Sequence, residues 1–510
     1  MRDRRALVAA FLSAVVPGLG QAYEGRVGPA LLFVAPLALL FAGAGIALGV
    51  ASLPQIGGAL LLPGVLTTIL VLDIALLAWR IAAVIDAWRA GRRRGTAHAG
   101  GRGAAAGTAI VLALVLVVVS VPHVVAGWYV AAASSAIVRI FAEPDADPLG
   151  GAGATPAPTL PGDAAAIAVA VPSGSPASPS TFGAATSGPA ASPTPIPTPS
   201  PSPTVAPLAN RLNVLLLGID SGPGRAQALT DTMIVVSLDP IGRTVSMMSV
   251  PRDTVGAPLG DGRVYLPKLN SLMGFAERNP DAFPGQKPVR VLKDTLGRML
   301  GIPIAYYAAV DLPGFIEVVD AIGGVDVVVK EPLNDGRYHE YGFRGFSIDP
   351  GCHHMDGKTA LAYARIRYSI GQNDFTRAGR QQQVLVAARD AVVRKWLLLD
   401  VPALLDALGQ TIRTDFPRSL LPQVADLAVG IDAGRVSRAV VQPPLVAYAD
   451  NEYGSVLLPD LPGILAVANG LFPAPGLTPV GWPAPTPTPT ATATAGTSRA
   501  PGLTPAPACP

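Results

Sequence analysis

Well-spaced arginines between Leu212 and Gln383 lie beside short polar turns that follow apolar stretches. The cations in this setting are Arg252, Lys268, Arg365, Arg367, Arg377 and Arg380, and the carboxylates are Asp220, Asp231, Asp253 and Asp374. Guanidinium groups bind phosphate oxygens through paired hydrogen bonds. Carboxylates that follow strands suit a hard divalent cation. The pattern therefore predicts a site for a pyrophosphate.

Moving a phosphoryl group from a pyrophosphate requires neutralised charge, a cation on the leaving group and a positioned hydroxyl. The basic side chains and a bound magnesium ion would supply the first two. Asp253 or Asp374 could deprotonate the attacking sugar hydroxyl. We favour an arginine-orienting role for Asp374 and leave Asp253 open. Because the arginines would repel one another, we expect a shared anionic ligand to explain their gathering.

Taken singly, each of these residues has a simpler explanation. Asp220 could cap a turn after its strand, and Arg365 and Arg367 could be solvated surface. The aromatic residues nearby are expected in the core rather than on a lipid-binding surface: Tyr306, Tyr307, Phe315 and Phe346. Only the ordered set of charges favours a site.

Apolar strands and helical stretches alternate through residues 209–475. Strands are expected at 211–220, 231–239, 244–251, 305–313 and 323–329, and helices at 287–301, 313–324, 357–368 and 379–397. Further helices in 398–475 should complete one face. This alternation predicts an α/β domain with helices on both faces of a mainly parallel or mixed sheet, with ligands at the strand ends.

The first 135 residues are expected to form a membrane region. The 510-residue chain has 50% hydrophobic residues and a mean hydropathy of +0.42. Residues 29–51, 59–79 and 107–131 are each long enough to cross a bilayer as helices. The first 26 residues have a basic head and a short apolar stretch, but no convincing cleavage site. We therefore expect a retained, half-inserted or interfacial segment rather than a cleaved signal.

Basic residues predict the orientation. They gather before the first span and between the second and third, at Arg2, Arg4, Arg5, Arg80, Arg89, Arg92, Arg93, Arg94 and Arg102. Both groups should be cytoplasmic, which leaves the chain after about residue 131 outside. Asp73 lies inside the second span, where a carboxylate is costly. We expect it to be neutral or bonded between helices, although the sequence shows no partner.

Two segments are rich in Pro, Ser, Thr and Ala, at 136–208 and 476–510. We expect a disordered spacer and a disordered tail without secondary structure. The chain has two cysteines, Cys352 and Cys509. A disulfide between them is possible outside the cytoplasm, but the tail position of Cys509 argues against it. Cys352 and the two histidines after it are expected in a turn rather than at a metal.

Seven motifs in order resemble the LytR–CpsA–Psr family over about 180 residues. They read LLLGID, LTDTMIVV, SVPRDT, KLN, VDLPGFIEVVDAIGGVDVVV, GCHHMDGKTALAYARIR and DFTRAGRQQQ. The resemblance implies an extracytoplasmic three-layer α/β/α domain that binds undecaprenyl-pyrophosphate-linked glycans. It also implies a phosphotransferase that attaches glycopolymers to peptidoglycan with Mg²⁺ at the pyrophosphate, and a long apolar tunnel for the prenyl chain.

The resemblance assigns roles position by position. It implies that Asp220 and Asp231 hold the metal, and that Asp374 orients arginines. The pyrophosphate-binding side chains that it implies are Arg252, Lys268, Arg365, Arg367, Arg377 and Gln381. Two positions where the family often has arginine are Leu229 and Gly256 here, and Arg225 or Arg263 could replace one of them.

Two other functions remain open. Water could replace the sugar hydroxyl, which would make the chain a polyprenyl-pyrophosphate pyrophosphatase. A membrane-tethered regulator of envelope gene expression is the non-enzymatic alternative. The formal charge of +3 and a short cytoplasmic loop without a helix-turn-helix pattern argue against nucleic-acid binding.

Overall fold

The computed structural model describes residues 2–51, 53–60, 62–94, 102–141, 165–169, 210–220, 229–395, 401–431, 433–480 and 509. The chain divides into two compact units, which are described separately. One comprises Met1–Pro148, Tyr307–Val436 and Pro487–Pro510, and the other Leu149–Tyr306 and Ser437–Thr486. Most of the two expected Pro-rich segments lies outside the described residues.

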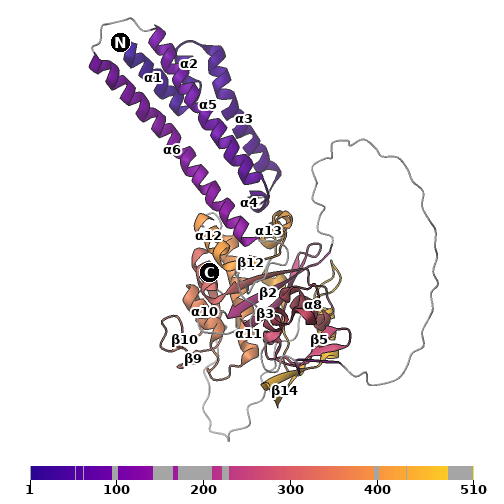
Figure 1. Cartoon of the computed structure of the whole chain (residues 1–510). Coiled ribbons are helices and arrows are strands. Elements are labelled where there is room, and N and C mark those ends of the chain that lie inside the picture. The colour runs from indigo at the N-terminus through magenta and orange to yellow at the C-terminus, as the bar shows by residue number, and fades with distance from the viewer. Residues whose placement is uncertain are drawn as a thin grey trace, which may run out of the picture. The chain divides into compact units, whose positions relative to one another are not determined.

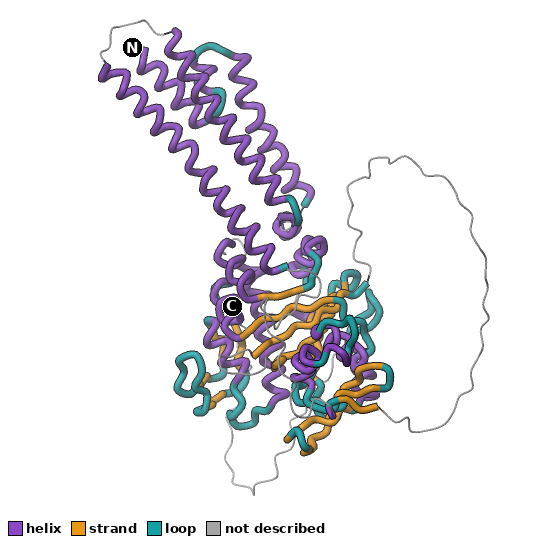
Figure 2. The backbone as a smooth tube through the Cα atoms, in the orientation of Figure 1, coloured by secondary structure: helices purple, strands orange, loops and turns teal. Residues whose placement is uncertain are grey.

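The described part of the membrane region is helical (Figures 1 and 2). Its helices are α1 (Arg2–Val15), α2 (Leu19–Tyr23), α3 (Val27–Val50), α4 (Leu53–Leu60), α5 (Val65–Arg94) and α6 (Arg102–Ile140). Three segments are long and apolar enough to cross a membrane: Val27–Val50, Val65–Arg93 and Gly107–Ile140. The expected second span at 59–79 was wrong by several residues, because Pro63 and Gly64 separate α4 from α5. The third helix also continues past residue 131.

α1 packs along α5 through small residues. A Cβ added at Gly91 would lie 2.6 Å from the Cα atom of Ala6, and Ala6, Ala9 and Ala10 are fully buried. Small side chains let helix backbones approach closely in membranes. Arg80 near the middle of α5 donates to the carbonyl of Ala14, so the two helices are antiparallel. The basic start of α1 and the basic end of α5 therefore lie together.

The PGLGQAYEG stretch, residues 17–25, packs against α1 and α5 through a buried polar network. Gln21 is fully buried, and its Nε2 donates to the carbonyl of Ala83 at 2.8 Å. Its Oε1 accepts from the hydroxyl of Ser13 at 2.8 Å. The amide's hydrogen bonds are satisfied by the neighbouring helices, as burial in an apolar bundle requires.

Asp73 has a partner in the next helix. Its Oδ1 lies 2.6 Å from Nδ1 of His123 in α6, and Nε2 of His123 lies 3.4 Å from Nη1 of Arg80. The carboxylate is thus bonded between helices, as expected. The sequence could not show this partner, because His123 is 50 residues away along the chain.

In the second unit, β2 (Leu212–Asp220), β3 (Leu229–Asp239) and β4 (Thr244–Ser249) form an antiparallel meander. β13 (Val436–Val440) lies beside β4. Only four residues join β3 to β4, and Arg243 adopts φ 49° there. So short a connection forces an antiparallel pair. This part of the sheet is therefore not parallel, although the layered α/β class was predicted correctly.

Helices and smaller strands complete this unit. The helices α7 (Leu272–Arg278), α8 (Pro288–Leu300) and α14 (Leu461–Leu471) pack on it. The smaller strands are β5 (Ala257–Gly260), β6 (Arg263–Tyr265), β14 (Val446–Asn451) and β15 (Gly454–Pro459). β1 (Ile167–Val169) pairs antiparallel with β6. The expectation of a spacer without secondary structure was wrong here, because the apolar run around Ile167 completes a sheet.

In the first unit, helices pack around the buried strand β8 (Val325–Val329). Its other strands are β7 (Tyr306–Asp311), β9 (Leu333–Asp335), β10 (Phe346–Ile348), β11 (Gly351–Met355) and β12 (Ile412–Thr414). Its helices are α9 (Leu312–Ala321), α10 (Gly357–Arg365), α11 (Asp374–Lys395), α12 (Val401–Thr411) and α13 (Leu421–Val429). Val325, Val327 and Val329 share a core with Tyr363 and Ile366. The expected aromatic core positions Tyr307 and Phe346 are buried.

Cys352 forms a disulfide with Cys509, with Cα atoms 5.2 Å apart. The expectation against this bond was wrong, since the chain end returns to β11. The expected turn at Cys352 is also wrong, because residues 351–355 pair with β8. His353 contacts the carbonyl of Asp349, and His354 contacts the Asp326 carboxylate.

Candidate functional site

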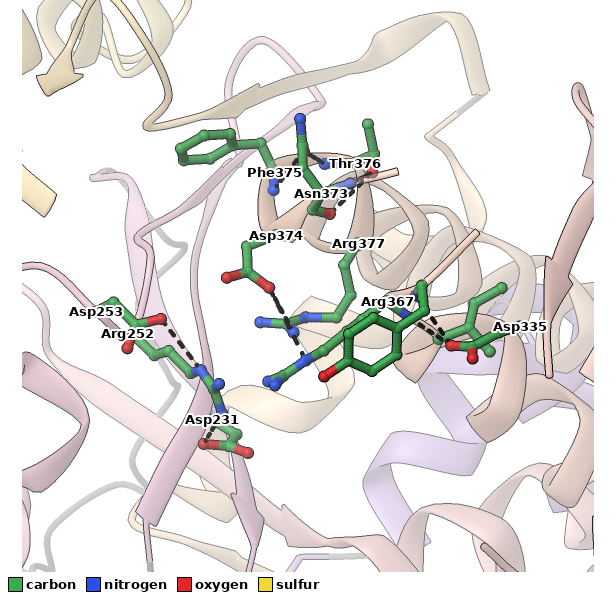
Figure 3. Close-up of polar contacts among 12 residues, drawn as sticks. Asp231, Arg252, Asp253, Asp335, Arg367, Asn373, Asp374, Phe375, Thr376 and Arg377 are labelled. Atoms are coloured by element: carbon green, nitrogen blue, oxygen red, sulfur yellow. Dashed lines mark hydrogen bonds and ion pairs between the residues drawn. The ribbon is translucent and has the colours of Figure 1, made fainter. Parts of the chain in front are cut away.

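Asp231, Arg252 and Asp253 form one charged cluster in the second unit (Figure 3), and Lys268 belongs to it through Asp253. Nη1 of Arg252 donates to Asp231 at 2.8 Å, and Nε of Arg252 lies 3.5 Å from Asp253. Nζ of Lys268 lies 2.9 Å from the other oxygen of Asp253. The four side chains are 17–28% exposed. A soluble anion can therefore reach both cations, while neighbouring carboxylates hold them in place.

Backbone hydrogen bonds position this cluster, which we call the Arg252 cluster. Arg252 lies three residues past Ser249, the last residue of β4, and its carbonyl accepts from the backbone N–H of Asn270 at 3.1 Å. The Leu269 N–H donates to the carbonyl of Thr254 at 2.8 Å. The loop after β4 is thus bonded to the segment that carries Lys268. These hydrogen bonds bring Arg252 and Lys268, which belong to two separate motifs, close together.

Asp220 and Asp231 lie near one end of the β2–β3 pair. Asp220 ends β2 opposite Leu229, and the register shifts between Gly218 and Ile219. Asp220 is 3% exposed. No group of three or more His, Cys, Asp or Glu side chains that could hold an ion occurs in the described residues. Two carboxylates nevertheless suit Mg²⁺, which takes one or two protein carboxylates together with waters and phosphate oxygens. The assignment of Asp220 and Asp231 to a metal stays a prediction.

Asp374, Arg377 and Arg367 form a second charged cluster in the first unit (Figure 3). Asp374 begins α11, and its Oδ1 lies 2.7 Å from Nη1 of Arg377 and 3.9 Å from Nε of Arg367. Asp374, Arg377 and Gln381 share one helix face, because they are three and four residues apart. Arg377 is 7% exposed, whereas the Arg367 side chain is 39% exposed. Arg367 is therefore the more accessible cation of this Asp374 cluster.

Arg365 ends α10, and the chain is extended at the next residue, Ile366. Ile366, between the two arginines, is buried. Nη2 of Arg365 lies 3.2 Å from Oε1 of Glu340. Arg365 and Arg367 thus have different carboxylate partners. The sequence did not indicate Glu340, which lies in the loop between β9 and β10.

Asp335 holds the backbone that carries Arg367. Its Oδ2 accepts from the N–H groups of Arg367 at 2.9 Å and Tyr368 at 3.1 Å, and its Oδ1 accepts from Arg337 N–H at 3.0 Å. Asp335 is 2% exposed. Burial opposes ionisation, but hydrogen bonds from Tyr368, Arg367 and Arg337 outweigh it, and the pKa of Asp335 lies below its usual value. Sequence reasoning missed this residue, although its Asn-Asp-Gly context signals a turn.

Arg380 is a structural residue rather than an accessible cation. It is 6% exposed, and it donates to the carbonyls of Tyr363 at 2.7 Å and Ile366 at 2.6 Å. A third bond reaches Oε1 of Gln372. Burial lowers its pKa to about 10. Its guanidinium therefore fixes the end of α10, where the sequence had suggested a phosphate contact.

Leu229 and Gly256 stand where the family often has arginine, and Arg263 and Arg225 are the possible replacements. Leu229 begins β3, and Gly256 adopts φ 66°. Arg263 donates to the carbonyl of Ala282 at 2.8 Å and lies over the Phe283 ring. Its guanidinium is thus engaged within its own segment. Arg225 lies outside the described residues.

Carboxylates lie beside the cations of both clusters. In the Arg252 cluster two carboxylates accompany two cations, and in the first unit Asp374 and Glu340 accompany the arginines. The expectation that only a shared anion explains these gathered cations was too strong, because carboxylates already offset their repulsion. An arriving phosphate would compete with those carboxylates for guanidinium hydrogen bonds.

Comparisons with known proteins bear on both clusters. Residues 191–453 match the sequence model of the LytR_cpsA_psr family, which is just over half of the chain. The matched range contains every residue of both clusters.

Two curated relatives cover much of this range. A Halalkalibacterium halodurans protein named polyisoprenyl-teichoic acid–peptidoglycan teichoic acid transferase TagU is 30% identical over 204 residues, which are 40% of this chain and 60% of that protein. The Staphylococcus aureus regulatory protein MsrR is 31% identical over 252 residues, which are 48% of this chain and 70% of that protein. The match thus spans less than two thirds of the transferase.

Among solved structures, TagT bound to LIIa-WTA aligns at 24% identity with a TM-score of 0.41, covering 53% of this chain and 92% of that one. Bacillus subtilis TagV aligns at 24% identity with a TM-score of 0.40, covering 51% and 96%.

Proposed function

The chain belongs to the LytR_cpsA_psr family, and from that premise we propose that it is a membrane-anchored phosphotransferase. It would move a glycopolymer from an undecaprenyl-pyrophosphate carrier to peptidoglycan. A relative that is 30% identical is named as a transferase acting on polyisoprenyl-linked teichoic acid and peptidoglycan. The observation that carries the proposal is the set of partly exposed cations that follow the family's motifs.

The residues have distinct proposed roles. Arg252, Lys268, Arg365 and Arg367 bind pyrophosphate oxygens, since their side chains are 19–39% exposed. Arg377 and Gln381 face the same side of α11 as Asp374 and extend that set. Each guanidinium would exchange a carboxylate for a phosphate oxygen as substrate binds.

Two carboxylates have separate tasks in this proposal. Asp374 already lies within 4 Å of two arginines, which supports the role of orienting them. Asp253 bonds Lys268 and Arg252. If substrate phosphate displaces those cations, Asp253 becomes available to accept the proton of the attacking sugar hydroxyl.

We propose that Asp220 and Asp231 hold Mg²⁺. The ion would offset negative charge on the pyrophosphate oxygens. Release of Asp231 from Arg252 would free the carboxylate for the metal and the guanidinium for phosphate.

We also propose a multi-pass arrangement with the family domain outside the cytoplasm. The basic ends of α1 and α5 lie together, which the positive-inside rule assigns to the cytoplasmic side. With the three candidate spans, residues after Ile140 would then lie outside. A reporter fused after residue 483 should be active outside the cytoplasm and one fused near Gly95 inside.

The activity is tested with the full chain in lipid nanodiscs. A radiolabelled glycan on a polyprenyl pyrophosphate is supplied with Mg²⁺, with and without peptidoglycan fragments. Transfer predicts label on peptidoglycan only when acceptor is present. Release of the glycan phosphate regardless of acceptor would identify a pyrophosphatase. Binding without turnover in either case would contradict an enzyme and favour the regulatory role that the name MsrR suggests for a relative.

A further inference from the structure

A groove of about 540 Å³ lies between the ends of α5 and α6 that are opposite the basic end of the bundle. Its apolar walls include Leu66 and Leu70 of α5 and Val130 of α6, and its polar side chains include Ser134, Ser135 and Arg139. The volume is that of a typical small-molecule site. A groove with apolar walls and a cationic rim suits an amphiphile with an anionic head.

α5 and α6 contact each other on the side of the groove that faces the basic end of the bundle. The Asp73–His123 contact of 2.6 Å joins α5 to α6 in the bundle. One turn further along α6, a Cβ on Gly127 would lie 3.5 Å from Leu70 Cδ1. α5 begins at Val65, next to the groove residues Leu66 and Thr67. The groove is therefore an opening at one end of an otherwise packed helix pair.

Two aromatic residues indicate where the groove lies relative to the membrane surface. Trp128 and Tyr129 are 61% and 45% exposed, and exposed aromatic residues at a span end mark the headgroup level. Arg139 is ten residues past Tyr129, or about 15 Å along a helix. The groove thus runs from the aromatic level to a height above the acyl chains.

The position of the groove above the acyl chains suits one class of lipid better than another. The head of an ordinary phospholipid remains near the aromatic level, because its chains fill the bilayer below. A polyprenyl pyrophosphate that carries a glycan must expose its phosphates to a domain outside the bilayer. A groove with apolar walls above the aromatic pair would shield the first isoprene units as they leave the acyl region.

Charge supports the same occupant. Among the described residues that line the groove, Arg139 is the one charged side chain, and hydroxyls of Thr67, Ser134 and Ser135 accompany it. A guanidinium and several hydroxyl groups match phosphate oxygens. The lining presents no carboxylate that would repel them.

We propose that the α5–α6 groove binds the head-proximal isoprene units and phosphate of a polyprenyl-phosphate-linked carrier. This rests on the proposed function, and it gives the additional helices a role beyond anchoring. The groove holds a waiting carrier by its first isoprene units, and Arg139 pairs with its phosphate before the pyrophosphate passes to the cations of the proposed transfer site.

The test uses the full chain in nanodiscs and a polyprenyl phosphate with a diazirine on its first isoprene unit. Irradiation should label the segment around residues 130–139, as mapped by mass spectrometry. Ala131→Phe fills the groove and Arg139→Gln removes the cation, and each should lower labelling several-fold. Ala113→Phe is the matched control, because Ala113 is also exposed on α6 and lies outside the groove lining.

Two outcomes would overturn the proposal. One is equal labelling in wild type and Ala131→Phe. The other is equal labelling of the groove by phosphatidylglycerol with the same diazirine, which would identify an ordinary anionic phospholipid.

A second readout separates this proposal from the proposed function. Transfer from a long-chain carrier in vesicles should fall several-fold in Ala131→Phe, while transfer from a soluble analogue that lacks isoprene units, a methyl ester of the glycan pyrophosphate, stays unchanged. If the wild type transfers neither substrate, the proposed function fails, and cross-linking still decides the groove. Equal losses on both substrates would contradict the groove as the site for the chain.

Discussion

The carboxylate of Asp335 accepts the backbone N–H of Arg367 at 2.9 Å. A side chain from the β9–β10 hairpin thereby fixes the loop after α10. Since the same carboxylate also accepts from Tyr368 and Arg337, one buried residue sets the path of the backbone that presents an accessible arginine. The position of Arg367 thus depends on a residue outside the conspicuous arginine motifs.

Asp335→Asn should destabilise the protein by about 1–3 kcal/mol, because an amide cannot accept from all three N–H groups. The pKa of Asp335 is lowered in the folded state, so its stabilisation is present above the unfolded pKa of about 3.9 and is lost as pH falls through the folded value. Urea unfolding from pH 7 to pH 3 should show the difference from wild type shrinking below about pH 4. Faster amide exchange at Arg367 and Tyr368 should accompany it. Asp349→Asn, at an exposed position, is the control, and equal exchange in both variants would contradict the assignment.

Arg380→Lys should cost about 2–3 kcal/mol, because a lysine cannot satisfy the separate acceptors that the buried guanidinium reaches. Thermal unfolding of the full chain in detergent measures the loss. Arg290→Lys is the matched control, since the Arg290 side chain is 54% exposed in an i,i+4 pair with Asp294 and should change stability little. Similar shifts for both variants would refute the structural role of Arg380.

Pyrophosphate should stabilise the wild type by mass action, at about 2.7 kcal/mol for a hundredfold excess over its dissociation constant. Replacing both Arg365 and Arg367 with Ala should remove most of that gain, and Lys should restore it only partly because it lacks the bidentate fork. Thermal shifts across a pyrophosphate titration give the result. Identical shifts in wild type and the double Ala variant would place the site elsewhere.

Changing Asp220 or Asp231 to Asn should reduce transfer at least tenfold and weaken the response to Mg²⁺. Stability should change less for Asp231→Asn, since the Asp231 side chain is 19% exposed, than for the buried Asp220. Turnover is measured over a Mg²⁺ series with circular dichroism as the folding control. Full activity in excess chelator would contradict the assignment of Asp220 and Asp231 to Mg²⁺.

The Cys352–Cys509 bond should appear as a linked peptide pair in unreduced protein. Reduction should lower stability by about 2–4 kcal/mol, and Cys352→Ser and Cys509→Ser should each match reduced wild type. Neither variant should respond to reductant. Two freely alkylated cysteines in protein taken directly from cells would contradict the bond, and with it an argument for export.

The sequence alone determined the kinds of elements and the kinds of chemistry. Apolar periodicity located β2, β3 and β4 and most helices. A helix or strand that buries one face has apolar residues at a regular spacing along the sequence. The basic clusters of the membrane region and the motif arginines were equally visible, since charge is a property of the residue itself.

Tertiary structure decided which residues meet. Asp335 with Arg367, Asp73 with His123, and Cys352 with Cys509 are 32, 50 and 157 residues apart, and no local pattern links such pairs. Burial also separated Arg380, which bonds three backbone and side-chain acceptors, from the more exposed Arg367 a short distance along the chain. Identical side chains acquire different roles because neighbouring elements, rather than sequence spacing, set their solvent access and their hydrogen-bond partners.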